Sequence, residues 1–132
     1  MVPESLGPIA PFFIVGALAD SLAFYEGVLR FELRARAPEE NPFFALVGRG
    51  SAQLCLKEIA PTVTPVPNRT QHEWASWDAF VHSADPDALA KEFAARGCPF
   101  LADLTDRDDG LRGFEVRDPD GYVLFFGRPL SF

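Results

Sequence analysis

The 132-residue chain contains the same pattern twice, and this internal repeat limits its possible folds more than any other feature. Residues 12–22 read FFIVGALADSL, and residues 79–89 read AFVHSADPDAL. A shift of 67 residues superposes Phe13 on Phe80 and aligns the two expected helix starts. Each copy is an apolar strand-like run, a turn and the beginning of a helix. We therefore expect two copies of one supersecondary unit.

The segments that follow the two copies also resemble each other. In the first half, Asp20 or Ser21 can cap a helix that runs to about Leu29. In the second half, Asp85 can cap a helix with Pro86 at its first position. Strand signals then follow at 31–36, 42–48 and 51–58 in the first half, and at 98–102, 111–118 and 122–127 in the second. Each half therefore predicts a βαβββ module.

A proline-rich stretch, residues 59–75, joins the two halves. It has three prolines between positions 61 and 67, which disfavour both a helix and a central strand. Plain connections are seldom this long, so we expect this connector to line a pocket as well. The chain is then one domain, residues 1–132, with a first module at about 9–58 and a second at about 76–128.

Charge and composition exclude several kinds of partner. The 12 Lys and Arg residues are outnumbered by 19 Asp and Glu, which gives a net charge of −7. We therefore expect no nucleic acid and no membrane partner, because both need clustered cations. Cys55 and Cys98 are too few for a disulfide framework, which predicts a reducing, cytoplasmic location. The alanine-rich composition with more arginine than lysine indicates a bacterial source.

The first expected strand is apolar on both of its faces. Alternation places Phe12 and Ile14 on one face and Phe13 and Val15 on the other. A helix can cover only one of them, so the second must meet another sheet, a partner chain or an enclosed ligand cavity. The sequence leaves these three possibilities open.

The same alternation assigns other side chains to this uncovered, concave face. In the strand at 51–58, leucines fit under a helix, which leaves Gln53, Cys55 and Lys57 on the concave side. For the strand that follows the connector, the 67-residue shift predicts a division into two sets. Trp77, Ala79 and Val81 are expected on the concave face, and Phe80 and His82 beneath the second helix.

A turn near the end of the chain fixes one more register. Asp-Pro-Asp-Gly at 118–121 favours a type I turn followed by a left-handed glycine. In that register Glu115 faces Phe125 on the concave side, whereas Phe114 and Val116 pack under the helix. A tighter two-residue loop would reverse the two faces. We favour the first register.

Two segments carry a resemblance to a known family. SLAFYEGVLRFEL in the first half and FEVRDPDGYVLFF near the end resemble the vicinal oxygen chelate superfamily, which contains glyoxalases, extradiol dioxygenases and bleomycin-resistance proteins. The resemblance implies an α+β fold in which two βαβββ modules form a cupped, eight-stranded mixed sheet with a helix outside each half. It also implies a homodimer. Arg30 stands where members commonly have glycine, so a strained left-handed residue is expected there.

The resemblance also implies where a metal would be bound. Family enzymes hold a divalent ion with residues of the first, fourth, fifth and eighth strands, and the matching positions here are Ala10, Cys55, Trp77 and Phe125. None is a carboxylate or an imidazole, which a hard divalent ion requires. We therefore predict no metal, no cofactor and no catalytic residue. Displaced ligands would be His72, Glu73 and Glu115.

These observations favour a metal-free binding protein, similar to the bleomycin-resistance members and related to antibiotic resistance. It would sequester an aromatic or cationic hydrophobic compound in an aromatic-lined cup. The predicted ligand-binding residues are Phe12, Ile14, Gln53, Cys55, Lys57, Trp77, Glu115 and Phe125. Two alternatives stay open: a divergent metal-dependent glyoxalase- or dioxygenase-like enzyme with displaced ligands, and a structural dimer whose cup is filled by side chains.

Overall fold

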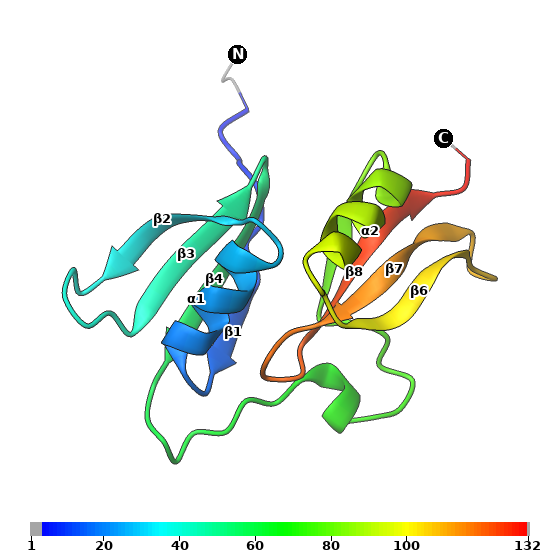
Figure 1. Ribbon diagram of the computed structural model, residues 1–132. Coiled ribbons are helices and arrows are strands. Elements are labelled where there is room, and N and C mark those ends of the chain that lie inside the picture. Colours follow the sequence, from blue (N-terminus) through cyan, green and yellow to red (C-terminus); the bar gives the residue numbers. More distant parts are fainter. Residues whose placement is uncertain (1–3, 132) are drawn as a thin grey trace.

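The computed structural model describes residues 4–131 and contains both expected modules (Figure 1). The first module consists of β1 (Phe12–Val15), α1 (Leu18–Gly27), β2 (Glu32–Ala37), β3 (Phe44–Arg49) and β4 (Ala52–Glu58). The second consists of β5 (Ala79–His82), α2 (Pro86–Ala95), β6 (Phe100–Asp106), β7 (Leu111–Arg117) and β8 (Val123–Pro129). The connector between them has one short 3-10 helix, η1 (Asn68–Thr70).

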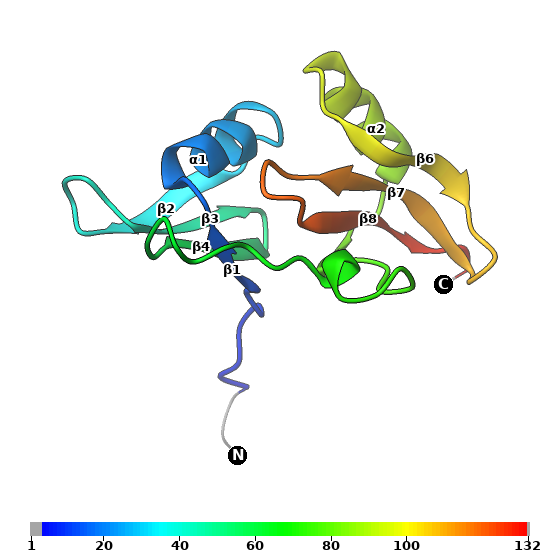
Figure 2. The ribbon, with the colours of Figure 1, turned by 90° about the horizontal axis from the view of Figure 1, so that it is seen from below.

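The eight strands form two mixed sheets of four, with the orders β1-β4-β3-β2 and β5-β8-β7-β6. In each sheet the first strand is parallel to the last strand of its module, and the other pairs are antiparallel. The sheets lie side by side with both helices on the same side, while the connector crosses on the other side beneath β8 (Figure 2). The predicted α+β class with two βαβββ modules is confirmed.

The second helix begins as the sequence predicted. Pro86 is its first residue, and the Asp85 side chain accepts a 3.1 Å hydrogen bond from the Ala88 N–H. None of the helices within residues 4–131 has the length and the apolar character of a membrane span.

The first helix begins differently, and the prediction of Asp20 or Ser21 as its cap was wrong. The helix already starts at Leu18, and its N-cap residue makes no side-chain capping bond. Instead, the Leu18 N–H donates to Glu58 Oε1 of β4 at 2.7 Å. Since this acceptor lies 40 residues away, no local sequence pattern could have indicated it.

The structural repeat has an offset of 68 residues, and this overturns one part of the prediction. Strands β1 and β5, and helices α1 and α2, each begin 68 residues apart. Ala79 and Val81 therefore face α2, while Phe80 and His82 lie on the sheet face without a helix. Side chains alternate with a period of two, so a shift of one residue exchanges the two faces.

One hydrophobic core continues through both modules. The rings of Phe13 in β1 and Tyr122 at the start of β8 stack at 4.1 Å with an interplanar angle of 8°. The Tyr122 hydroxyl also donates to the Ile14 carbonyl at 2.6 Å. This aromatic contact and its hydrogen bond fix the end of β8 against the edge of β1.

Candidate functional site

The sheet faces without a helix hold most of the predicted ligand-binding residues, and we call them the open faces. The turn at 118–121 has the predicted form, because Asp118 N–H donates to the Tyr122 carbonyl and Gly121 has a φ of 91°. Glu115 consequently pairs with Phe125 in register on the open face of the second sheet. The prediction for this hairpin is confirmed.

The first-module open face is apolar and partly exposed to solvent. Phe12 pairs with Cys55, and Ile14 pairs with Lys57, so these four predicted residues share one face. The Phe12 ring is 56% exposed and stacks on Phe44 at 6.3 Å. This face therefore offers an accessible aromatic surface to a ligand or to another protein chain.

Aromatic rings fill the second-module open face. A Cβ on Gly127 would lie 2.6 Å from the Phe125 ring, so the ring lies flat on the strands where glycine leaves space. Trp77 packs on Phe125 with 4.8 Å between ring centroids, and Phe80 packs on it at 5.3 Å. Phe125 is fully buried as a result. Trp77 and Phe80 form the outer surface of this aromatic stack.

Two arginines cover Glu115, which we predicted to orient a ligand. Arg69 of the connector donates to its Oε1 at 3.1 Å, and Arg107 of the β6–β7 turn donates to its Oε2 at 3.0 Å. The Arg107 guanidinium also lies 5.1 Å from the centroid of the Phe125 ring. Glu115 is only 3% exposed, so both carboxylate oxygens serve to hold the connector and the turn.

The predicted residues therefore form two groups. Phe12, Ile14, Cys55 and Lys57 lie together on the first-module open face, whereas Trp77, Glu115 and Phe125 pack together on the second. Gln53 lies at the end of β4 nearest the second module, where it lines a cavity.

Sequence reasoning missed Arg69, Arg107 and Phe80 at this site. The arginines come from the connector and from a turn, segments without periodicity that could have indicated their direction. A signal for Phe80 existed, because alternation from the paired Phe125 would have placed it on the open face if the repeat had been aligned with an offset of 68.

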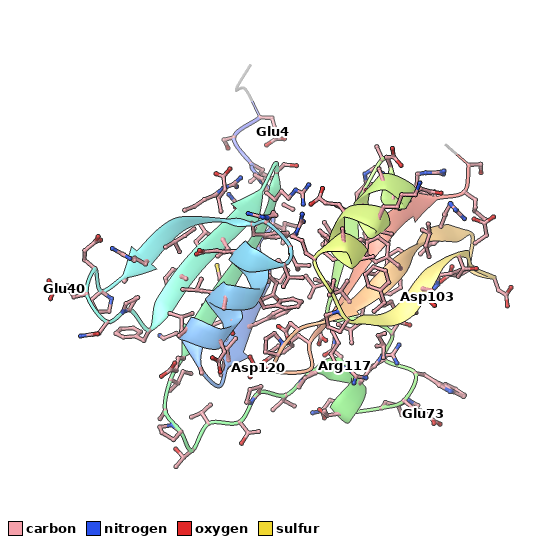
Figure 3. All side chains as sticks on the ribbon, viewed as in Figure 1. Glu4, Glu40, Glu73, Asp103, Arg117 and Asp120 are labelled. Atoms are coloured by element: carbon pink, nitrogen blue, oxygen red, sulfur yellow. The ribbon has the colours of Figure 1, made fainter. Side chains whose placement is uncertain are left out.

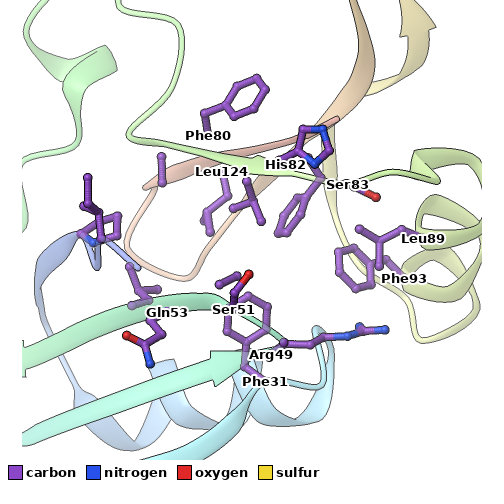
Figure 4. A pocket seen from close by; sticks show the side chains of 18 residues that line it. Phe31, Arg49, Ser51, Gln53, Phe80, His82, Ser83, Leu89, Phe93 and Leu124 are labelled. Atoms are coloured by element: carbon purple, nitrogen blue, oxygen red, sulfur yellow. The ribbon is translucent and has the colours of Figure 1, made fainter. Parts of the chain in front are cut away.

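Two cavities lie where the modules meet. The larger, of about 430 Å³, separates the β3–β4 turn from β5 and α2 (Figure 4). Its apolar wall consists of Phe31, Leu54, Leu89, Phe93, Leu124 and Phe126. The smaller, of about 400 Å³, lies between the edge of β1, including Phe12 and Ile14, and connector residues Thr64, Val66 and Asn68. Both volumes are in the range of small-molecule sites.

An ion pair bridges the modules beside the larger cavity. Arg49 of β3 lines the cavity and makes two bonds to Glu92 of α2, at 2.7 and 2.8 Å. Arg96 also donates to Glu92. The Arg49 bond is the main cause that lowers the pKa of Glu92 to about 2. The carboxylate therefore stays ionised and holds α2 to β3 at neutral pH.

The residues present do not fit the divalent metal of the family enzymes. Cys55 has no imidazole or carboxylate beside it at the matching positions, and within residues 4–131 no three His, Cys, Asp or Glu side chains lie close enough to hold an ion. Both oxygens of Glu115 are taken by arginines. His72 Nδ1 accepts from the Trp74 N–H, and Glu73 lies at the edge of the molecule (Figure 3). We derive no metal-dependent step.

Both cysteines are free thiols. Burial raises the pKa of the Cys98 thiol to about 11, which leaves it protonated and unreactive at neutral pH.

Known proteins with the same architecture fall in one family. A family model described as the Glyoxalase/Bleomycin resistance protein/Dioxygenase superfamily matches residues 5–126. No curated protein matches the chain. The solved structure of TioX from Micromonospora sp. ML1 superposes with a TM-score of 0.71 at 20% identity, covering 93% of this chain and 99% of TioX.

Two further structures are described as binding proteins. TnmS3, an antibiotic binding protein from Streptomyces sp. CB03234, has a TM-score of 0.67 at 20% identity and covers 98% of this chain and 99% of its own. The bleomycin-binding protein from Streptomyces verticillus, complexed with copper(II)-bleomycin, has a TM-score of 0.65 at 26% identity, covering 96% of this chain and 97% of its own.

Proposed function

The chain belongs to the glyoxalase/bleomycin resistance protein/dioxygenase superfamily, and from that premise we propose that it is a binding protein that sequesters a small aromatic compound without using a metal. The observation that carries this proposal is the first-module open face. Phe12 and Phe44 form an exposed aromatic surface there, beside a cavity of about 400 Å³. Such a surface can stack on a planar ligand while the cavity encloses part of it.

The proposed ligand is an uncharged aromatic compound rather than a cation. A cationic ligand needs an acid that is available to it, and Glu115 is already bound by Arg69 and Arg107. The net charge of −7 describes the whole chain and not this surface. The antibiotic-binding neighbours support sequestration of a natural product, and the free cysteines agree with a cytoplasmic location in a bacterium.

The proposal includes a homodimer. Phe12, Phe43 and Ile59 are each about half exposed, which is unusual for large apolar side chains of a monomer. A second copy that packs beside the first-module open face would cover part of this surface and enclose the ligand. Light scattering of the purified protein tests this, and a monomer at micromolar concentration would contradict it.

The binding proposal is tested with the neutral fluorophore N-phenyl-1-naphthylamine. We expect the probe to bind to the wild-type chain and to bind about tenfold more weakly to Phe12→Ser, because burying an aromatic side chain contributes about 1.5–3 kcal/mol. Trp74→Ser is the control, since Trp74 is a highly exposed aromatic residue of the connector. Equal loss in both variants, or no binding to the wild-type chain, would contradict the proposal.

Metal dependence needs a separate measurement. Elemental mass spectrometry of the purified protein, repeated after incubation with zinc, iron, manganese and nickel, should give well under one ion per chain. One tightly held ion per chain would instead favour the enzyme alternative.

A further inference from the structure

Strands β1 and β5 each form one edge of their sheet, and their main chains follow the same arrangement. In a parallel strand pair, alternate residues direct both main-chain groups toward the neighbouring strand. Ser83 N–H donates to the Gly127 carbonyl in β8, and Gly127 pairs in register with His82. Residues 81 and 83 therefore point toward β8, and the N–H and C=O groups of Phe80 point away from it.

The edge of β1 confirms this geometry. Cys55 N–H donates to the Pro11 carbonyl, which directs the main-chain groups of Phe12 and Ile14 away from β4. The Ile14 carbonyl is indeed bonded from that side, by the Tyr122 hydroxyl. For Phe80 there is no such partner: in the part of the chain that the structure describes, its main-chain groups make no hydrogen bond outside the sheet.

The main chain of Phe80 borders the cavity of about 430 Å³, which the whole of β5 lines. Figure 4 shows the Phe80 ring turned away from this cavity, so the cavity meets its peptide groups and not its ring. Across the gap lies the β3–β4 turn with the polar side chains of Ser51 and Gln53. The cavity thus has a strand edge with unused hydrogen-bonding groups on one side and polar side chains opposite.

We propose that this cavity binds a short, extended, peptide-like chain, which adds as a strand to the edge of β5 and pairs with the N–H and C=O of Phe80. The inference rests on the proposed binding function and names the ligand class. A purely hydrocarbon ligand would cover these two groups without bonding them, which is unfavourable, whereas an amide satisfies both. Strand addition of this kind obtains affinity from main-chain bonds and specificity from alternate side chains.

The cavity also fits the alternate side chains of such a ligand. Side chains on one face of the added strand would point toward Phe31, Phe93 and Phe126, which are apolar. Those on the other face would lie near the exposed Phe80 ring. We therefore expect apolar side chains on the peptide.

The first test compares two probes that differ only in their amide hydrogens. Dansyl-Leu-Val-Leu amide is titrated against the wild-type chain, followed by the same peptide methylated at each peptide nitrogen. We expect the methylated peptide to bind at least tenfold more weakly. Equal affinities would overturn the proposal.

The second test uses matched variants of one residue. Phe80→Pro and Phe80→Ala both lose the ring, but only proline loses the N–H. Because this N–H points away from β8, proline at this edge leaves the sheet bonds intact. We expect Phe80→Pro to bind the unmethylated peptide at least tenfold more weakly than Phe80→Ala. Equal binding would overturn the proposal, and if Phe80→Pro does not fold, the methylation comparison still decides.

Other outcomes separate this inference from the proposed function. If N-phenyl-1-naphthylamine binds and the peptide does not, the peptide inference fails and the binding function stands. If neither binds, both fail. If the peptide binds only while it dissociates a dimer, as seen by light scattering, the edge of β5 belongs to a strand of a second copy and the proposal is overturned.

Discussion

The hydroxyl of Tyr25 donates a 2.7 Å hydrogen bond to Asp118, and this bond joins the helix of the first module to the closing turn of the second. The other carboxylate oxygen of Asp118 accepts from the N–H groups of Asp120 and Tyr122, both at 2.9 Å. Burial outweighs these bonds and raises the pKa of the Asp118 carboxyl to about 6. The packing of the modules is therefore coupled to the protonation of one carboxyl group.

This coupling predicts a pH dependence of stability. A carboxyl whose pKa is higher in the folded chain than in the unfolded chain binds its proton more tightly when folded. Its stabilising contribution is complete below about pH 4 and is lost as the pH rises through about 6. The loss corresponds to about 3 kcal/mol for a rise of roughly two pKa units. Urea unfolding of the wild type and of Asp118→Asn between pH 4 and 8 measures it.

The quantity to follow is the wild-type free energy of unfolding minus that of Asp118→Asn, because other titrating groups then cancel. We expect this difference to fall as the pH rises. Tyr25→Phe removes one donor to the carboxylate, so in that background the midpoint should move to higher pH. A difference that grows with pH would show that the hydrogen bonds outweigh burial.

Arg30 carries avoidable backbone strain. It lies after α1 with a φ of 60°, where an L-residue other than Asn or Asp is disfavoured by about 1–2 kcal/mol. Among residues 4–131 it takes part in no ion pair that would offset this. Arg30→Gly should therefore raise the free energy of unfolding by about 1 kcal/mol. Asn41→Gly is the matched control, since Asn41 has a φ of 51° but tolerates it, and should change stability less.

How far the sequence could predict the molecule depended on where the information lies. The turn at 118–121 specifies its own geometry, so the register of Glu115 against Phe125 followed from four residues. The face of β5 did not follow, because Phe80 and Val81 are both apolar and the repeat aligns almost equally well with an offset of 67 or 68. Alternation predicts faces only when the two faces differ in polarity.

Long-range polar contacts were beyond prediction for a different reason. Arg69 reaches Glu115 across 46 residues from a connector without regular structure. Neither residue type indicates its partner, since twelve cations and nineteen acids allow many pairings. The cavities likewise depend on how the modules pack, which periodicity within one element does not encode.

Glu115→Gln should release the connector from the second sheet. The substitution leaves two guanidinium groups without their shared carboxylate, and bonds to charged groups contribute about 1.5–3 kcal/mol each. Both arginines are partly exposed, so water compensates in part, and we expect a total loss of about 2 kcal/mol in urea unfolding.

Limited trypsin digestion gives an independent readout for this variant. Cleavage after Arg69 should be several-fold faster in Glu115→Gln than in the wild type, because its side chain is no longer held. Glu73→Gln is the control, since Glu73 is an exposed connector acid without an ion pair in the described part of the chain. Unchanged cleavage in Glu115→Gln would show that other contacts hold the connector.

Gly127→Ala should disturb the aromatic stack from beneath. A Cβ there would lie 2.4 Å from the Arg112 carbonyl oxygen and 2.6 Å from the Phe125 ring, so both the neighbouring strand and the ring must shift. Overpacking of this kind costs about 1–3 kcal/mol. Near-ultraviolet circular dichroism should also change, because Trp77 packs on Phe125. The control is Gly27→Ala at the end of α1, where nothing lies within 4 Å, and it should stabilise the chain by up to about 1 kcal/mol. Full stability with an unchanged spectrum in Gly127→Ala would mean that Phe125 does not lie on the strand as described.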